Sequence, residues 1–208
     1  MKILIVGATG PTGQLLVKQA LYKFYQVTVL VRDTSKLHLM NENLTVIKGD
    51  VLDEATLTDA LKGQDAVLSA LGTGNSLKSS DLMLHAVTSL ILTMKAANVK
   101  RVILLSAFGV GETFVQANFI QKLIFRLPLK NIYSDKTKAD TMLCNSALDW
   151  TIVCPAKLTD GPYTGKYEAA EKLPMKGMPK ISRSDVADFM LRQLIDDNFL
   201  KKIAILMS

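Results

Sequence analysis

Cysteine and long apolar runs are scarce in this chain, and each shortage excludes a class of protein. The two cysteines, Cys144 and Cys154, make neither a disulfide framework nor a set of metal ligands. No uncharged apolar stretch approaches the about eighteen residues that cross a membrane. The chain enters an apolar segment at its second residue, without the charged and long apolar regions of a signal peptide. We therefore expect a cytoplasmic protein with no metal site and no membrane partner.

Positive charge exceeds negative charge, but it is not concentrated in one place. The formal net charge is +6, and the basic residues are scattered along the chain without interleaved aromatic side chains. Nucleic-acid-binding proteins usually gather such residues on one surface, so we expect no nucleic-acid partner. The excess suits a ligand that carries several phosphates, although general surface charge explains it equally well.

The chain does contain a clear opening unit of strand, turn, helix and strand. Residues Lys2 to Val6 form an apolar run rich in β-branched side chains, which predicts a buried strand. The turn after it has glycines three residues apart, and an apolar-periodic helix opens through Leu15 and Leu16. A second apolar strand, Gln26 to Val31, closes the unit at Arg32. This order is typical of a dinucleotide-binding sheet.

The glycines fit a phosphate-binding turn. Gly7 allows a sharp turn out of the strand, and Gly13 lets the helix pack tightly on the sheet. At Gly10, a Cβ would stand in the path of a pyrophosphate that approaches the bare N–H groups of the helix N-terminus. Pro11 fits the first helical position, where its missing N–H would have had no intrahelical partner. Three glycines can also make only a turn, but the flanking strands and helix favour the functional interpretation.

Strands and helices alternate through most of the remaining chain. The patterns predict strands at 44–47, 65–71, 101–105 and 150–154, an edge strand at 202–207, and helices at 53–61, 80–97, 115–126, 134–145 and 184–195. Residues 159–179 are rich in Gly, Pro and Tyr and predict a long loop with a short strand near 166–169. The alternation indicates an α/β, single-domain Rossmann fold: a doubly wound, mostly parallel sheet with helices on both faces. We expect residues 1–208 to form one NAD(P)-binding domain, in which residues about 156–183 are a loop region on the substrate side.

The end of the second strand bears on the choice of cofactor. An NAD site usually has an acidic residue there to bind the ribose 2′-OH, whereas this chain has Arg32 followed by Asp33. Arginine can pair with a 2′-phosphate, and Lys36 adds a second positive charge, so we expect NADP(H) to be preferred over NAD(H). The alternative is that Arg32 is an exposed strand-end charge and Asp33 serves NAD. Asp50, at the end of the third strand, suits a hydrogen bond to the adenine amino group or, alternatively, caps a turn.

Motifs along nearly the whole chain resemble one family. The segments GATGPTG (7–13), VLVRD (29–33), KGDV (48–51) and SAF (106–108) resemble the atypical short-chain dehydrogenases/reductases. The segments GQDAV (63–67), LGT (71–73), TGKY (164–167), IS (181–182) and DFMLR (188–192) look like its NAD(P)H-binding, NmrA-like branch, which contains biliverdin-IXβ reductase, also called flavin reductase. The resemblance implies a Rossmann fold, NADPH binding and reduction of flavins or other planar conjugated acceptors.

The same resemblance assigns cofactor contacts by position. It gives Gly10, Thr12 and Gly13 to the pyrophosphate, with Gly7, Thr9 and Pro11 of the same turn also expected to bind the cofactor. It gives Arg32 and Lys36 to the 2′-phosphate, Asp50 and Val51 to the adenine, Leu71, Gly72 and Thr73 to the ribose side, and Ser106 and Pro155 to the nicotinamide end. One departure concerns the substrate. Where the flavin reductase has an active-site histidine soon after its strand-end proline, this chain has Lys157.

The Tyr–Lys dyad of typical short-chain dehydrogenases is absent, because none of the five tyrosines has a lysine four residues on. Reduction of a delocalised acceptor needs less of the protein, since the cofactor carries the hydride and solvent can supply a proton. We expect Ser106 to lie nearest the reaction and Lys157 to bind an acidic group of the substrate. The alternative for Ser106 is a hydrogen bond to its own backbone, and the alternative for Lys157 is a solvated side chain in a loop. Lys136 and Asp140 either match a Lys-x-x-Ala-Asp pattern of atypical members or form a surface ion pair.

These observations favour an NADPH-dependent reductase that acts on a small, planar acceptor. The alternative is a non-catalytic NADP-binding redox sensor of the NmrA-like type, which would regulate a protein partner. A nucleotide-sugar epimerase or dehydratase is disfavoured, because about fifty residues after the sixth strand are too few for a substrate domain.

Overall fold

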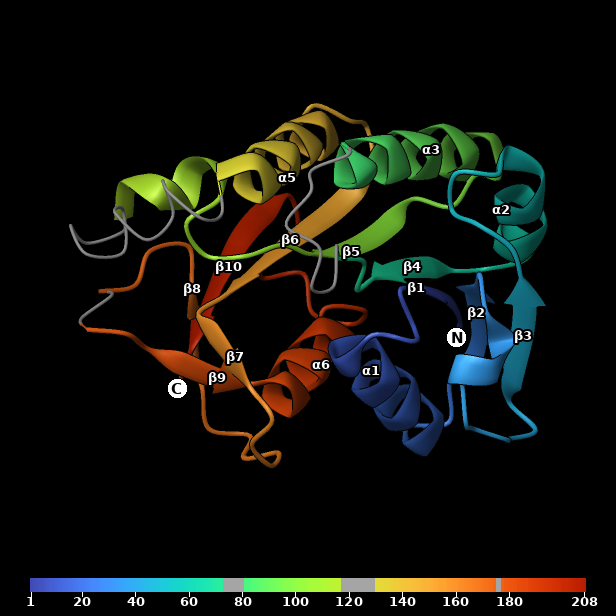
Figure 1. The fold of residues 1–208 in the computed structure, drawn as a ribbon, viewed down its shortest axis with the longest axis horizontal. Coiled ribbons are helices and arrows are strands. Elements are labelled where there is room, and N and C mark those ends of the chain that lie inside the picture. Colours follow the sequence, from blue (N-terminus) through green and yellow to red (C-terminus); the bar gives the residue numbers. More distant parts are fainter. Residues whose placement is uncertain (73–80, 117–129, 175–176) are drawn as a thin grey trace.

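The computed structural model describes residues 1–72, 81–116, 130–174 and 177–208 (Figure 1). The large sheet contains β1 (Lys2–Val6), β2 (Gln26–Val31), β3 (Leu44–Lys48), β4 (Ala66–Ser69), β5 (Arg101–Leu105), β6 (Asp149–Pro155), β8 (Glu168–Ala170) and β10 (Lys202–Met207). A second, two-stranded sheet contains β7 (Lys157–Thr159) and β9 (Lys180–Ser182). The helices are α1 (Pro11–Tyr22), α2 (Glu54–Leu61), α3 (Leu82–Ala96), α5 (Lys130–Cys144) and α6 (Arg183–Arg192), with short 3₁₀ helices η1 (Thr34–Lys36) and η2 (Gly111–Gln116).

The strand order of the large sheet is β3-β2-β1-β4-β5-β6-β10-β8. Its neighbouring strands pair in parallel except at the last pair, where β8 runs antiparallel to β10. Figure 1 shows α2, α3 and α5 on one face of the sheet and α1 and α6 on the other. The chain is thus a doubly wound Rossmann fold, and the predicted fold class is confirmed.

The central strands are mostly apolar on both sides, because helices cover both faces of the sheet. In β1, Ile3 and Ile5 belong to the apolar cluster beneath α1 and α6, whereas Leu4 and Val6 belong to the cluster beneath α2, α3 and α5. All four side chains are at most 1% exposed. Each such burial stabilises the fold by roughly 1.5–3 kcal/mol. The two cores fix the sheet, and the sheet in turn fixes the position of every strand end.

One prediction about the last third of the chain is wrong, and two further predictions need comment. Residues Lys202–Met207 are not an edge strand, because β8 pairs with their outer side, with Leu206 opposite Ala169. The predicted loop, residues 159–179, starts at the last residue of β7, and β7 pairs with β9 just beyond the loop's end. The helix predicted at 115–126 is described only up to Gln116, which ends η2; residues 117–129 lie outside the described residues.

Side chains cap the starts of two helices, α2 and α6. Asp53 caps α2 by accepting a hydrogen bond from the Ala55 N–H. Ser182 caps α6 by accepting a hydrogen bond from the Asp185 N–H. Such caps satisfy N–H groups that have no partner within the helix. At the start of α1, by contrast, no side chain caps the helix.

Candidate functional site

A cleft of about 630 Å³ lies over the carboxyl ends of β1, β2, β4 and β5, at the N-terminus of α1. This volume is within the range of about 300–1,000 Å³ that small-molecule sites occupy. The described lining contains every residue predicted to contact the cofactor except Gly13, Thr73 and Pro155. The rule that ligands bind over the carboxyl ends of parallel strands therefore locates the hollow from sequence alone.

The three exceptions have different causes. Thr73 lies outside the described residues. Gly13 is buried beneath the turn, and Pro155 ends β6, where its carbonyl accepts a hydrogen bond from Phe108 N at 3.0 Å. Lys157 is exposed in β7 and is not among the described lining residues, although its neighbour Leu158 is. The role predicted for Lys157 stays a prediction.

The glycine turn is built around two close backbone approaches. Gly7 has a φ of +78°, and a Cβ there would lie 2.6 Å from the backbone of Ala70. A Cβ on Gly13 would lie 2.1 Å from the Gly7 carbonyl oxygen. Gly10 differs, because its Cβ would meet only the Gly7 oxygen, at 3.4 Å. The turn thus needs Gly7 and Gly13 for packing, and Gly10 borders the open cleft.

Basic side chains gather at the end of the cleft next to β2. Arg32 and Lys36 both line the cleft, whereas Asp33 does not. The Asp33 carboxylate instead caps η1 by accepting hydrogen bonds from the Ser35 hydroxyl at 2.6 Å and the Ser35 N–H at 3.1 Å. These two bonds, with the charge of Lys36, hold the pKa of Asp33 below its usual value. The residues of this loop that face the cleft are therefore the two cations.

Asp50 caps a turn and also lines the cleft. Its Oδ1 accepts a hydrogen bond from Leu52 N at 3.0 Å, so the carboxylate does cap a turn. Asp50 lines the cleft together with Val51, and its role toward the adenine stays a prediction. Asp50 can hold the turn with one oxygen and leave the other for a ligand.

At the other end of the cleft, Ser106 is paired with a buried carboxyl group. The Ser106 hydroxyl donates to Asp140 Oδ2 at 2.7 Å, so it is not bonded to its own backbone. Asp140 is 7% exposed, which makes the interpretation of Lys136 and Asp140 as a surface ion pair wrong. Half-buried Lys136 lines the cleft one turn earlier on α5. Burial raises the pKa of Asp140 to about 6, although the bond from Ser106 and the charge of Lys136 oppose the change.

Leu158 and Arg183 are among the lining residues that were not individually predicted from the sequence. Arg183 is the first residue of α6 and forms an ion pair with Asp160, with Nη1 and Oδ1 2.6 Å apart. It reaches the cleft because α6 packs beside α1, where Gln19 Nε2 donates to the Ser184 carbonyl at 2.9 Å. No local sequence pattern predicts the contact between Gln19 and Ser184, because 165 residues separate them in the chain.

The described lining fits a phosphate-rich nucleotide. It holds four basic side chains, Arg32, Lys36, Lys136 and Arg183, against one carboxylate, Asp50. The α1 N-terminus has no side-chain cap and no acidic residue in its first turn, so its N–H groups are available to an anion. Gly10 leaves space for close approach at that point. A dinucleotide would find phosphate donors in the middle of the cleft and cations at both ends.

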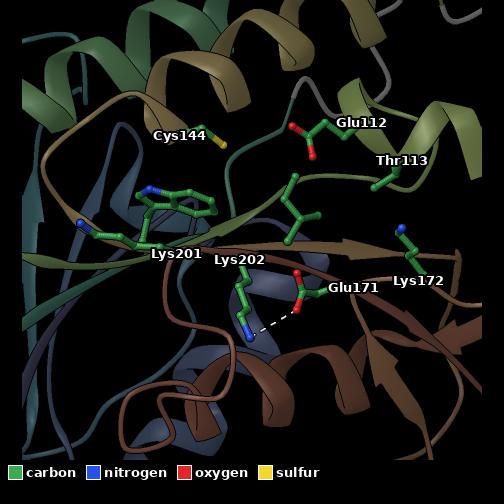
Figure 2. Close-up of a pocket in the computed structure, with 9 residues that line it drawn as sticks. Glu112, Thr113, Cys144, Glu171, Lys172, Lys201 and Lys202 are labelled. Carbon is green, nitrogen blue, oxygen red and sulfur yellow. Dashed lines mark ion pairs between the residues drawn. The ribbon is translucent and has the colours of Figure 1, made fainter.

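A second hollow, of about 830 Å³, is larger but lies elsewhere (Figure 2). Trp150 and Lys202, which line it, are at the amino ends of β6 and β10. Lys202 is paired there with Glu171, with Nζ and Oε1 3.2 Å apart. Ligands of open α/β sheets bind at the opposite, carboxyl ends of the strands. Position rather than size therefore identifies the first cleft as the candidate site.

Fold and cleft together define a dinucleotide-binding protein of the atypical short-chain dehydrogenase/reductase class. More particularly, the chain belongs to the NAD(P)H-binding family, whose model matches residues 7–197. The resemblance inferred from the motifs is thereby confirmed at the level of the family, one of NAD(P)H-binding oxidoreductases. A nicotinamide cofactor is the ligand that this family binds.

Relatives match over almost the whole chain. The UPF0659 protein YMR090W of Saccharomyces cerevisiae is 30% identical over 95% of this chain and 88% of its own length. The photosystem II assembly factor Ycf39 of Synechocystis is 26% identical over 97% of this chain and 61% of its own length. Among solved structures, the oxidoreductase ylbE of Lactococcus lactis has a TM-score of 0.83 and 27% identity, covering 100% of this chain and 91% of that one.

The described residues contain neither a cluster of metal ligands nor a membrane-spanning helix. No group of three or more His, Cys, Asp or Glu within them is placed to hold a metal ion. No helix within them is long and apolar enough to cross a membrane.

Proposed function

We propose that the protein is an NADPH-dependent reductase that transfers a hydride to a flavin or another planar conjugated acceptor. The observation that carries the proposal is the single cleft that joins the uncapped N-terminus of α1, the cations Arg32 and Lys36, and Ser106. The nicotinamide cofactor supplies the hydride when it is bound. The protein has to hold the cofactor, orient the acceptor beside it and allow a proton to reach the acceptor.

Each part of the lining has a task under this proposal. The glycine turn binds the pyrophosphate, Arg32 and Lys36 bind the 2′-phosphate, and Leu71 and Gly72 border the ribose. Ser106 orients the nicotinamide or the acceptor. We assign the whole chain to one NAD(P)-binding domain, in which residues 156–183 border the acceptor; Leu158 and Arg183 on the cleft support that assignment. A cation at Arg183 suits an acceptor with an acidic substituent.

The proposed activity is tested by following NADPH oxidation with FMN, riboflavin, a quinone and a dye offered in turn. We expect turnover with at least one of these planar acceptors, because a delocalised acceptor needs positioning more than bond polarisation. NADPH binding is measured by fluorescence in the same samples. Tight NADPH binding without turnover of any acceptor would contradict the reductase.

Such a result would favour the second candidate function, an NADP-binding redox sensor. Two observations support that candidate: no tyrosine is among the described residues of the cleft lining, and one relative carries the name of an assembly factor rather than an enzyme. A sensor should bind NADP⁺ and NADPH with unequal affinity, which the same fluorescence titrations measure.

The preference for NADPH predicts the behaviour of Arg32→Ala. Loss of the guanidinium is expected to weaken NADPH binding by roughly 1.5–3 kcal/mol, the range for charged hydrogen bonds, and to leave NADH binding nearly unchanged. Fluorescence titration with each cofactor measures both affinities. Lys62→Ala is the matched control, because Lys62 is exposed, pairs with Asp59 and lies outside the cleft lining. Equal losses for NADPH and NADH would refute the role of Arg32.

A further inference from the structure

We propose that Asp140 stores a proton and passes it through the Ser106 hydroxyl to the acceptor in the cleft. The inference rests on the proposed reductase function and adds a proton path to it. Asp140 is not among the described lining residues, whereas Ser106 lines the cleft and is joined to it by a bond of 2.7 Å. Asp140 therefore acts through Ser106 and does not itself touch the acceptor.

The pair has two hydrogen-bonding states that differ by one proton. With Asp140 ionised, Ser106 donates to the carboxylate, as in the structure. With Asp140 protonated, the carboxyl group donates to Ser106 Oγ, and the serine O–H is then free to donate elsewhere. Because Ser106 lines the cleft, the second state offers a proton there. A serine without an ionisable partner has no such second state.

The surroundings of Asp140 allow its charge to change near neutral pH. The groups that act on it from the elements packed around it are the Ser106 hydroxyl after β5, Lys136 one turn earlier on α5, the Cys144 thiol one turn later, and the Cys154 thiol of β6. Burial raises the pKa of both thiols, so both are neutral at physiological pH. Among the described residues in this set, Lys136 is the basic one, and it also borders the cleft.

The proton and electron balance of the step is complete. The acceptor, a flavin, quinone or conjugated carbonyl compound, gains an electron pair with the hydride from NADPH, which is oxidised to NADP⁺. The Ser106 O–H bond breaks as its proton moves to a nitrogen or oxygen of the acceptor. The Asp140 O–H bond breaks as its proton moves to Ser106 Oγ. Water in the cleft then returns a proton to Asp140 through the same serine.

The first test needs neither cofactor nor acceptor. Infrared spectra of the free protein between pH 4.5 and 8 report the C=O stretch of protonated carboxyl groups. We expect a band that disappears as the pH rises through about 6 in the wild type and is missing in Asp140→Asn, an exchange of nearly equal size. Asp59→Asn, on an exposed residue of α2, is the control and should keep the band.

The second test is the pH profile of turnover with the best acceptor found. Because the protonated form delivers the proton, the wild-type kcat should fall as the pH rises above about 6. Asp140→Asn and Ser106→Ala should each lower kcat at pH 6 by roughly 10- to 100-fold and remove this pH dependence. The solvent deuterium isotope effect on kcat should also fall in both variants. NADPH affinity of Asp140→Asn, from fluorescence, should stay within about twofold of wild type.

The possible outcomes distinguish failure of the proton relay from Asp140 through Ser106 from failure of the reductase function on which the relay rests. A wild type that reduces no acceptor would refute the reductase, and the relay's task with it. A reductase whose pH profile is unchanged in Asp140→Asn, or whose infrared band persists in that variant, would refute the relay alone. If Asp140→Asn is poorly folded, Ser106→Ala keeps the kinetic test, since it removes the hydroxyl and leaves Asp140 in place.

Discussion

Replacing Gly13 with alanine is expected to destabilise the free protein by roughly 2–4 kcal/mol and to abolish tight NADPH binding. The added Cβ would lie 2.1 Å from the Gly7 oxygen, 2.8 Å from the Gly7 carbonyl carbon and 2.9 Å from Ala8 Cα. All three are backbone atoms, so no side-chain rotation relieves the clash. Alanine is a better helix former by about 0.5–1 kcal/mol, which is less than the cost of overpacking. The start of α1 must therefore move away from the turn.

Urea unfolding followed by circular dichroism measures the loss of stability, and fluorescence titration measures the loss of binding. Gly10→Ala is the matched control, three residues away. Gly10 has an extended backbone, with φ −74° and ψ 161°, and its Cβ would meet only the Gly7 oxygen at 3.4 Å. Its stability should change by only about 0.5 kcal/mol, while its NADPH affinity should fall at least about tenfold because the methyl group borders the phosphate position. Wild-type stability in Gly13→Ala, or wild-type affinity in Gly10→Ala, would contradict this account of the turn.

The sequence predicts the central strands well because their burial is complete. Residues 2–6, 26–31 and 101–105 are apolar runs bounded by polar or glycine residues, and the structure has strands at these bounds. A strand that is covered on both faces has no exposed polar face, so its ends in the sequence are easy to recognise. Once the strands are placed, the rule for their carboxyl ends predicts most of the cleft lining.

The short strands could not be predicted in the same way. Each of β7, β8 and β9 has three residues, too few for an alternating pattern to show. The strand predicted near 166–169 overlaps β8, but its pairing with β10 was not predicted. The error at Lys202–Met207 follows from this, because the strand stops being an edge only through its pairing with β8. Its own sequence is the same in either position.

The pairing of Ser106 and Asp140 shows a second limit. The spacing of Lys136 and Asp140 places them on one face of α5, but spacing does not say whether that face meets water or the sheet. The hydrogen-bond partner of Asp140 lies 34 residues earlier, at the end of β5. Long-range packing thus decides whether the same pattern is a surface ion pair or a buried acid next to the cleft.

Asp185→Ala is expected to cost roughly 2–4 kcal/mol of stability, because one buried carboxylate holds the loop at residues 164–165 against α6. Asp185 is 1% exposed. Its Oδ1 accepts from Thr164 N at 2.8 Å and Gly165 N at 2.9 Å, and its Oδ2 accepts from the Thr164 and Ser182 hydroxyls, each at 2.9 Å. The Asp185 N–H in turn donates to Ser182 Oγ at 3.0 Å, so Ser182 caps the start of α6. Alanine would free the loop and weaken the cap together.

Urea unfolding at pH 7 measures this loss, and two further variants define its origin. Asp59→Ala removes a helical carboxylate that is 63% exposed and paired with Lys62, and it should change stability by at most about 0.5 kcal/mol. Asp185→Asn keeps one oxygen for the two N–H donors, and the hydroxyls of Thr164 and Ser182 can rotate to accept from its amide, so its loss should be smaller than that of alanine. Equal losses in Asp185→Ala and Asp59→Ala would refute the anchoring role.

The pH dependence of the same experiment tests whether the anchor is the charged carboxylate. Burial acts to raise the pKa of Asp185, but the bonds from Thr164, Gly165 and Ser182 outweigh it and leave the pKa below its usual value. A carboxyl group with a lower pKa in the folded state stabilises the protein fully above its unfolded pKa of about 3.9 and loses that contribution as the pH falls through the folded value. The gap between wild type and Asp185→Ala should therefore be constant from pH 7 to about pH 5 and narrow below about pH 4. A gap that is as wide at pH 3 as at pH 7 would mean that the loop is held by packing and not by the charge of Asp185.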